Sequence, residues 1–194
     1  ESGHIVGNIY KGRIQNVLPG MQAVFVDIGR DRNAFLHVGD LSGGHARSEE
    51  PISIGREIIV QVAKDAIGTK GPRLTTQLTL PGRYVVLMPT VDFLGVSRRI
   101  PEEEERKRLK EVAETVRPAG MGMIVRTAAE GRSEEDLRRD TAYLENLWNA
   151  LAARAKRAQA PTLLYRDVDL VIRIVRDYFS ADVEKIVFDS REAL

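Results

Sequence analysis

Residues 7–41, GNIYKGRIQNVLPGMQAVFVDIGRDRNAFLHVGDL, read as three short β-strands divided by turns. The segments 9–17, 21–29 and 33–41 are rich in β-branched and aromatic residues, and Pro-Gly and Gly-Arg-Asp-Arg-Asn signals separate them. EIIVQVAKDA (57–66) and RLTTQLTL (73–80) have the same character, whereas the polar stretch 45–55 resembles a loop. Five short strands without an intervening long helix predict a small closed β-barrel.

Side-chain alternation sorts the residues of this barrel between its two faces. Phe25 alternates with the core candidates Val24 and Val26 and shares its side with Asp27, so we expect its ring to face outward. Phe35 lies beside His37 in the same way. Lys11 and Arg13 share one side of the first strand. Two exposed rings beside cations would form a stacking platform for single-stranded bases, although a strand phenylalanine more often belongs to the core.

After Pro81-Gly82 the pattern changes to alternating strands and helices, which places a domain boundary there. The apolar run 83–88 and the segment 122–127 are typical of buried strands. Pro101, followed by four glutamates, predicts the start of a helix, and Ser133 with Asp136 predicts the capped start of a longer helix spanning 133–158. Residues 162–166, 169–179 and 185–190 then read as strand, helix and strand. The layout is a β-barrel followed by an α/β unit.

Composition excludes several classes of protein. The 194 residues are 43% hydrophobic and 29% charged with a net charge of +1, which is typical of a globular protein and gives no overall basic field for a polyanion. With no cysteine and three scattered histidines, we expect neither disulfides nor a zinc site. The sequence shows no apolar run long enough to span a membrane and no secretory leader, so we expect a soluble cytoplasmic protein.

Three further sequence motifs follow, from the end of the predicted barrel onward: TKGPRLTTQLTLPGRYVVLMP (69–89), GVSRRI (95–100) and GMGMIVRTAAEG (120–131). Together with residues 7–41, they resemble the ribonuclease E/G family of bacterial endoribonucleases, and 161–190 is similar to the start of its ribonuclease-H-like subdomain. The resemblance implies an α+β fold: an S1-type OB-fold five-stranded barrel at 7–81, an α/β 5′-sensor region at 82–161, and an incomplete ribonuclease-H-like segment at 162–194.

The same resemblance implies roles for particular residues. The family's S1 face grips single-stranded RNA through two phenylalanines and a lysine, which here match Phe25, Phe35 and Lys70. Its sensor holds the 5′-monophosphate of RNA, and the matching residues are Arg126, Thr127, Gly82, Val86, Arg98 and Arg99. The chemistry agrees, because a guanidinium can make paired charge-assisted hydrogen bonds to phosphate oxygens. Without the resemblance, an Arg-Thr pair after a strand is most often an ordinary strand exit.

The resemblance also implies what this stretch lacks. The family's Mg²⁺-holding catalytic carboxylates and its zinc linker belong to later parts of the protein, so we expect no catalytic residue and no metal site here. Asp167, Asp169 and Asp177 flank a predicted amphipathic helix, where capping and solvation account for them. We expect the parent protein to be a homo-oligomeric endoribonuclease of RNA processing and decay, and this part of it to bind RNA without cleaving it.

Two other functions stay open at this point. S1-type barrels occur in non-catalytic RNA-binding proteins of translation and transcription, and fold alone does not determine function. The helix at 133–158 could also dock a partner protein, although an apolar face that packs on its own domain gives the same pattern. The sequence does not separate E-type from G-type members or show the cleavage preference.

Overall fold

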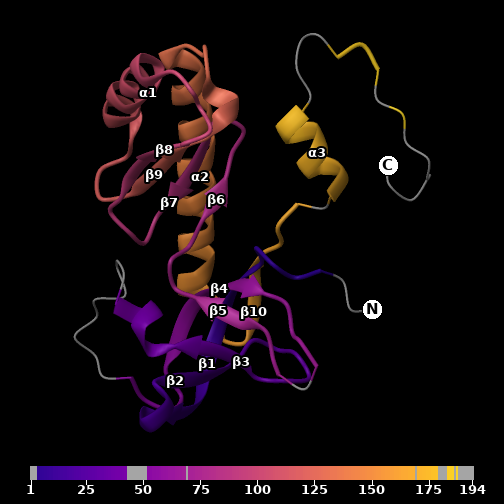
Figure 1. Cartoon of the computed structure of the whole chain (residues 1–194). Helices are drawn as coiled ribbons and strands as arrows, with labels where there is room; N and C mark the ends of the chain where they lie inside the picture. The colour runs from indigo at the N-terminus through magenta and orange to yellow at the C-terminus, as the bar shows by residue number, and fades with distance from the viewer. Residues whose placement is uncertain are drawn as a thin grey trace.

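The structure is a computed structural model that describes residues 4–42, 52–68, 70–168, 170–178, 183–185 and 187. A β-barrel lobe and a second, α/β lobe lie one above the other, and the long helix α2 (Glu134–Arg157) runs from the second lobe down to the barrel (Figure 1). Most of the predicted strand at 185–190 and most of the predicted loop at 45–55 lie outside the described residues.

The barrel consists of β1 (Ile9–Leu18), β2 (Ala23–Asp27), β3 (Ala34–His37), β4 (Glu57–Lys64) and β5 (Arg73–Thr75). Its strand order is β1-β2-β3-β5-β4, and β4 pairs with β1 to close the sheet. All the pairings are antiparallel except the parallel pair β3–β5. Short 3₁₀ turns occupy Pro19–Met21 and Val38–Ser42. The predicted five-stranded barrel is therefore confirmed.

The alternation of side chains in these strands is also confirmed. Val24, Val26 and Leu36 are fully buried in the barrel interior, whereas Phe25 and Phe35 are half-buried and lie outside that core. The interior is built mainly from aliphatic side chains, together with the buried ring of Tyr10, which suits the narrow lumen of a five-stranded barrel.

The fifth predicted strand, 73–80, is wrong in its extent. It divides into β5, which stays in the barrel, and β6 (Leu80–Pro81), which pairs with β7 in the second sheet. The division comes at residues 76–79, where the Thr90 hydroxyl accepts a hydrogen bond from Leu78 N and donates one to Thr76 O. These bonds satisfy backbone groups that leave the barrel ladder, so the chain turns from one lobe into the other.

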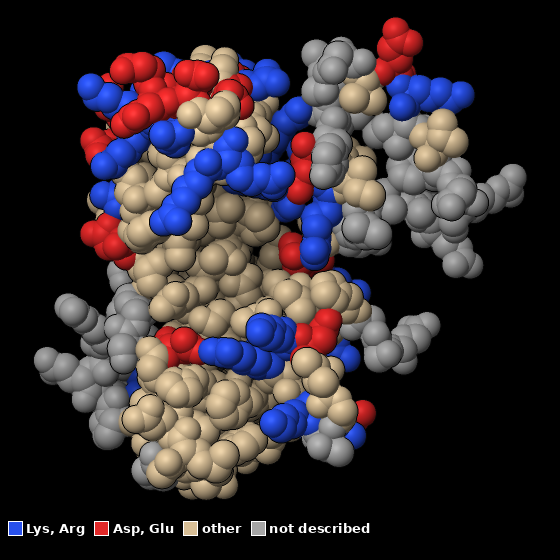
Figure 2. All heavy atoms as spheres, in the orientation of Figure 1, with Lys and Arg blue, Asp and Glu red and all other residues tan. Residues whose placement is uncertain are grey.

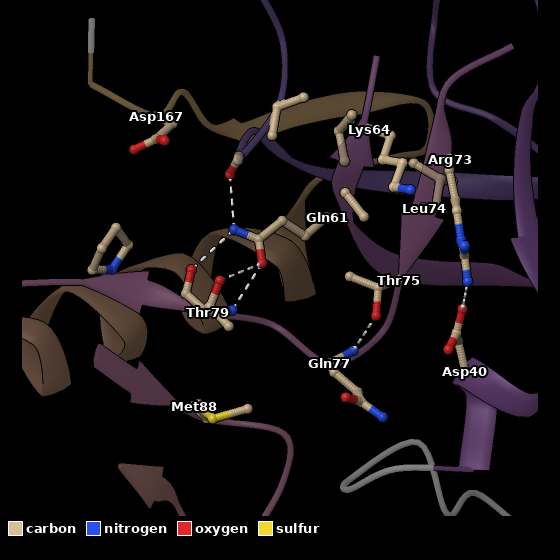
Figure 3. A pocket seen from close by; sticks show the side chains of 15 residues that line it. Asp40, Gln61, Lys64, Arg73, Leu74, Thr75, Gln77, Thr79, Met88 and Asp167 are labelled. Carbon is tan, nitrogen blue, oxygen red and sulfur yellow. Dashed lines mark hydrogen bonds and ion pairs between the residues drawn. The ribbon is translucent and has the colours of Figure 1, made fainter. Parts of the chain in front are cut away.

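A buried glutamine holds the two lobes together at this crossing. The Gln61 side-chain amide donates to the carbonyls of Gly7 and Thr79, at 2.9 Å each, and its oxygen accepts from Thr79 N at 2.8 Å. A cavity of about 490 Å³ lies beside it (Figure 3). Figure 3 also shows Arg73 directed toward Asp40, across 3.6 Å. Both the amide nitrogen and the amide oxygen of Gln61 are therefore hydrogen-bonded where the chain passes between the lobes.

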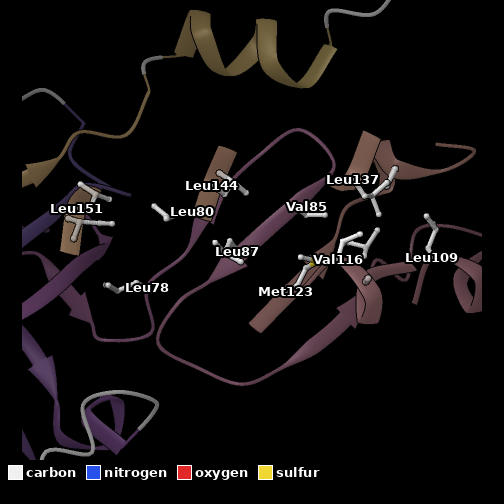
Figure 4. Packing of buried hydrophobic residues seen from close by; sticks show 14 of the residues in the cluster. Leu78, Leu80, Val85, Leu87, Leu109, Val116, Met123, Leu137, Leu144 and Leu151 are labelled. Atoms are coloured by element: carbon white, nitrogen blue, oxygen red, sulfur yellow. The ribbon is translucent and has the colours of Figure 1, made fainter. Parts of the chain in front are cut away.

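The second lobe packs two helices against one face of a four-stranded sheet. The strands are β6, β7 (Val85–Met88), β8 (Leu94–Val96) and β9 (Gly122–Val125), in the order β6-β7-β9-β8, with β8 parallel to β9. Helix α1 (Glu103–Val116) and α2 cover the sheet. Figure 4 shows the shared core, in which Val85, Leu87 and Met123 of the sheet meet Leu109, Leu137 and Leu144 of the helices.

The helix starts follow the sequence closely. Ser133 and Asp136 form a full capping box at the start of α2, as predicted. In α1, Glu102 is the N-cap and makes no side-chain cap, so Pro101 precedes the helix rather than opening it. The apolar stripe of α2 is buried in the core of its own lobe. The face that could have docked an external partner is thus occupied within the chain.

After α2 the chain returns to the barrel and then leaves it again. Strand β10 (Thr162–Tyr165) pairs antiparallel with the first residues of β1, so the segment expected to open the ribonuclease-H-like region is hydrogen-bonded to the barrel sheet. Helix α3 (Leu170–Tyr178) follows and lies beside the second lobe (Figure 1). Residues 162–178 therefore contact both lobes, the barrel through β10 and the second lobe through α3.

Candidate nucleic-acid interface and anion site

Phe25 and Phe35 form an aromatic pair on the outside of the barrel. They are register partners in the β2–β3 ladder, and their ring centroids lie 6.1 Å apart with the ring planes at 71°. Direct cross-strand partners on one face are held close by the sheet itself. The residues that flank each ring along its own strand fill the barrel interior, so the two rings lie together on the outer face.

Lys70 lies in the same groove, although it is 35 residues after Phe35. The groove has a volume of about 750 Å³, and both rings and Lys70 line it. Gly71 makes this approach possible, because a Cβ at this position would overlap the carbonyl oxygen of Asn33 in the β2–β3 turn. Phe35 N also donates to Pro72 O at 2.8 Å, which secures the loop beside β3. The structure therefore brings the three predicted S1-face residues together.

The groove contains further residues that the sequence argument did not select. Two have an exposed apolar side chain, two are cations at strand ends, and one is a cation in the β2–β3 turn: Met21 and Ile67, Lys64 and Arg73, and Arg32. Two large apolar side chains beside rings and cations suit the faces and the backbone of a single strand of nucleic acid. A signal was present for Lys64 and Arg73, which stand where β4 ends and β5 begins, but a strand-end cation alone is too common to be selected.

Lys11 and Arg13 do not join this groove. Lys11 Nζ donates to Ala155 O and Ala158 O at the end of α2, at 3.0 and 2.8 Å, and lies 2.7 Å from Glu57 Oε2. Its side chain is only 15% exposed. Arg13 donates to Glu57 and to Ala160 O. Hydrogen bonds from Lys11 and from Ala160 N lower the pKa of the Glu57 carboxyl. The two cations thus join the barrel to the end of α2.

In the second lobe, one edge of the sheet collects the predicted sensor residues. The parallel strands β8 and β9 end side by side at Val96 and Val125, so the Ser-Arg-Arg string and the Arg-Thr pair leave the sheet at the same edge. Strand β7 runs antiparallel to β9, so its start lies at that edge too, and Arg126 N donates to Tyr84 O at 2.7 Å. Three strings scattered over 45 residues of sequence therefore converge.

The Arg126 guanidinium is the centre of this edge. Its Nη1 donates to Gly82 O at 2.5 Å and to Asp177 Oδ1 at 2.8 Å, and its side chain is about one-quarter exposed. Its Nε and Nη2 make no hydrogen bond to the residues that the structure describes. A guanidinium with N–H groups still open and its chain positioned by carbonyls is suited to bind an anion.

Thr127 lies next to it in a small hydroxyl network. Thr127 Oγ1 and Ser97 Oγ are 2.8 Å apart, and Ser97 Oγ also accepts from Arg99 N at 3.3 Å. If Ser97 donates its proton to Thr127, the Thr127 hydroxyl proton is free to point to a ligand. Arg98 and Arg99 are exposed, and within the described ranges neither guanidinium forms an ion pair. Val86 is half-buried and alternates with the core residues Val85 and Leu87, on the open face of the sheet.

Helix α3 adds two residues that the sequence argument did not place here. The Asp177 carboxylate accepts from Arg126 and from Arg176 Nε, both at 2.8 Å, and Arg176 Nη1 donates to Pro81 O at 3.0 Å. Burial alone would raise the pKa of Asp177, but the hydrogen bonds from Arg126 and Arg176 outweigh it and hold that pKa well below its usual range. Asp177 is therefore ionised and lies against the Arg126 guanidinium. No local sequence signal shows this contact, because it joins residues 51 positions apart.

No metal site is found in the part of the chain that the structure describes, where no three His, Asp or Glu side chains gather as ligands. Asp167 instead pairs with Arg173 at 2.8 Å. The helices of the described ranges include none that is long and apolar enough to cross a bilayer. On the face shown in Figure 2, Lys and Arg side chains form a band across the second lobe that reaches the side of α3, and acidic side chains gather over α1.

Comparison with known proteins gives a consistent result. The sequence pattern of the Ribonuclease E/G family matches residues 79–194. Ribonuclease G of Salmonella typhimurium is 47% identical over 200 residues, covering 96% of this chain and 41% of that protein. Ribonuclease E of a Nostoc species is 47% identical over 197 residues, covering 98% of this chain and 29% of its own length. Ribonuclease G of Escherichia coli is 46% identical, with 96% and 41% covered. The chain thus spans less than half of each of these relatives.

Proposed function

Because this chain belongs to the ribonuclease E/G family, we propose that it is the RNA-gripping part of a single-strand-specific endoribonuclease of RNA processing and decay. The barrel groove binds single-stranded RNA, and the sheet edge at Arg126 recognises its 5′-monophosphate. Hydrolysis of the phosphodiester, oligomer formation and the Mg²⁺ that assists hydrolysis belong to other parts of the whole protein.

The observation that carries this proposal is the meeting of Phe25, Phe35 and Lys70 in one groove. Each ring offers a face on which a base can stack, whatever the base, and such a stack contributes about 1–3 kcal/mol. Lys70 supplies a charge for the phosphate backbone. The two rings meet edge to face, so we expect two neighbouring bases to splay apart rather than stay stacked on each other.

Recognition of the RNA end rests on the second lobe. A terminal monophosphate carries a charge of about −1.5 to −2 at pH 7 and has three free oxygens, whereas an internal diester carries one charge. Arg126 can accommodate two of these oxygens and Thr127 a third, with the exposed Arg98 and Arg99 adding positive potential nearby. A 5′-hydroxyl offers none of these contacts. The site therefore favours phosphorylated ends.

The described residues do not fit a resident metal ion. Within them no cluster of carboxylates and imidazoles has the number of ligands that Mg²⁺ or Zn²⁺ needs, and the acidic side chains at Asp167 and Asp177 are already paired with arginines.

A binding titration tests the proposal. Fluorescence anisotropy with a short single-stranded RNA, carrying a 5′-monophosphate or a 5′-hydroxyl, would be measured at fixed salt. We expect Phe25→Ala to weaken binding of both RNAs about tenfold or more, and Arg126→Ala to remove only the advantage of the monophosphate. Phe93→Ala is the matched control, because Phe93 is an exposed ring outside the groove.

The outcome separates the two functions that involve RNA. Equal binding of both RNAs, with no effect of Arg126→Ala, would favour a plain RNA-binding module over an end-sensing one. Binding that is indifferent to Phe25→Ala as well would overturn the barrel groove as the RNA site.

A further inference from the structure

The anion site at Arg126 already holds an anion, which the chain itself supplies. Asp177 Oδ1 accepts a hydrogen bond from Arg126 Nη1 at 2.8 Å, and the same oxygen accepts from Arg176 Nε at 2.8 Å. The Asp177 carboxylate thus lies between two guanidinium groups, on the Nη1 side of Arg126. Figure 2 shows acidic and basic side chains meeting along the seam between α3 and the second lobe.

The Asp177 carboxylate and a terminal phosphate are both anions that Arg126 can bind, so they can compete for it. Asp177 contributes one negative charge and two oxygens, and its effective concentration is high because α3 is part of the same chain. A terminal phosphate brings up to two negative charges and three oxygens. If a phosphate used only the open Nε and Nη2 groups of Arg126, it would stand beside the Asp177 carboxylate and be repelled by it.

Few described contacts hold helix α3 on the second lobe. Two polar contacts join it to the second lobe: the pair of Asp177 with Arg126, and Arg176 Nη1 donating to Pro81 O at 3.0 Å. Ile172 and Ile174 are 55% and 47% exposed, so these two apolar side chains of the helix stay largely in solvent. A cavity of about 220 Å³, lined by Tyr143, Leu147 and Ile172 among others, lies beneath it. For Ile172 and Ile174, separating α3 from the lobe therefore exposes little additional apolar surface.

We propose that Asp177 is an intrachain competitor for the anion site, and that a 5′-terminal phosphate binds Arg126 by displacing Asp177 together with α3. This inference rests on the proposed 5′-end recognition. It makes the site self-inhibited: RNA ends that lack a terminal phosphate leave α3 in place, and only a phosphate group opens the site.

The test is a titration of the 194-residue chain and its Asp177→Asn variant with the same single-stranded RNA in 5′-monophosphate and 5′-hydroxyl forms. Removing the competing charge is expected to tighten binding of the monophosphate RNA by about three- to tenfold, a size typical of a partly exposed ion pair. Binding of the 5′-hydroxyl RNA should not change, because the barrel groove carries it.

Asp92→Asn is the matched control. Asp92 is also a carboxylate paired with one arginine, Arg117, on the second lobe, but it precedes β8, whereas the anion site follows that strand. Asp92→Asn changes the net charge of the chain by the same amount as Asp177→Asn. A gain that Asp92→Asn reproduces would be a general charge effect and would overturn the proposal.

Hydrogen exchange followed by mass spectrometry gives a second readout that does not depend on affinity. Amides of α3 should exchange faster when the monophosphate RNA is added, and should not respond to the hydroxyl RNA. In Asp177→Asn they should exchange faster without RNA. Unchanged α3 exchange at saturating monophosphate RNA would overturn displacement even if the affinity rises.

Arg126→Ala distinguishes failure of this inference from failure of the proposed function. If Arg126→Ala removes the preference for the monophosphate while Asp177→Asn binds like the original chain, end recognition stands and the competitor role of Asp177 is wrong. If no variant shows any preference for the monophosphate, end recognition itself fails, and the inference fails with it.

Discussion

Gly82 lies so close to Asp140 of α2 that a Cβ carbon at position 82 would stand 2.5 Å from Asp140 Oδ2. The same carboxylate accepts hydrogen bonds from Arg83 N, Tyr84 N and Val85 N, at 3.2, 2.7 and 3.0 Å. Gly82 O in turn accepts from Arg126. Helix α2 therefore holds the start of β7 through one carboxylate, and that segment holds the guanidinium of the anion site.

Gly82→Ala is expected to disturb this arrangement. The methyl group would push Asp140 away from the three N–H groups, which lowers the free energy of unfolding by about 1–3 kcal/mol. It should also reduce the preference for 5′-monophosphate RNA, because Gly82 O moves relative to Arg126. Urea unfolding and anisotropy measure the two effects.

Gly20→Ala is the control for that substitution. A Cβ at position 20 meets no atom within 4 Å, so the free energy of unfolding should stay within about 0.5 kcal/mol of its original value. If both alanine variants are equally stable, Asp140 does not lie against Gly82 in solution.

The lysines of the barrel are expected to separate into one that binds RNA and one that stabilises the fold. Lys70→Met should leave the free energy of unfolding unchanged and reduce the slope of log K for RNA against log salt by about 0.7, the value for one lost contact to single-stranded phosphate. Lys11→Met should lower the free energy of unfolding by about 1–2 kcal/mol, because two carbonyls at the end of α2 lose their donor. Glu57 keeps Arg13 and Ala160 N as partners.

The salt slope decides between these roles. For Lys11→Met it should equal that of the original chain. A reduced slope in this variant, with stability unchanged, would return Lys11 to the RNA-binding face.

Ser97→Ala is expected to weaken recognition of the phosphorylated end by about threefold, the size of one neutral hydrogen bond. The substitution removes the hydroxyl that orients Thr127 Oγ1, at 2.8 Å. Ser97→Thr retains the hydroxyl and should restore the preference. Anisotropy with both RNA forms measures this, and loss of affinity for the 5′-hydroxyl RNA to the same extent would point to a general structural defect.

Glu105 is expected to make stability depend on pH in the acid range. Hydrogen bonds from Arg108, and then from Gly131 N, lower the pKa of the Glu105 carboxyl from its ordinary 4.5 to about 2. A group whose pKa is lower in the folded state stabilises the fold above its unfolded pKa, so this contribution is present above pH 4.5 and is lost between pH 4.5 and 2.

Comparison of the original chain with Glu105→Gln measures that contribution. Because Arg108 is 42% exposed, water screens the pair, and we expect a difference in unfolding free energy of about 1 kcal/mol above pH 5. The difference should shrink as the pH falls toward 2. A difference that is constant with pH would show that the charge of Glu105 contributes nothing.

Much of the fold could be predicted because its determinants are local. Strand alternation assigned Phe25 and Phe35 to the outside of the barrel, and the Ser133–Asp136 capping box marked the start of α2. Such signals act over two to four residues, which is the range of strand pleat and helix turn. The extent of the fifth strand was wrong because the Thr76–Thr90 contact that ends it comes from a different lobe.

The sequence by itself determined the barrel, the order of elements and the outward-facing rings, since periodicity and turn residues express these directly. The tertiary structure alone decided what each cation does. Lys11 shares with Lys70 a place on the outside of the barrel, but the end of α2 returns over it after 144 residues, whereas Lys70 stays open to the groove. Arg126 likewise contacts Asp177 because α3, 51 residues later in the chain, returns to the second lobe. A charge acts on whatever lies within a few ångströms, and only the folded chain decides what that is.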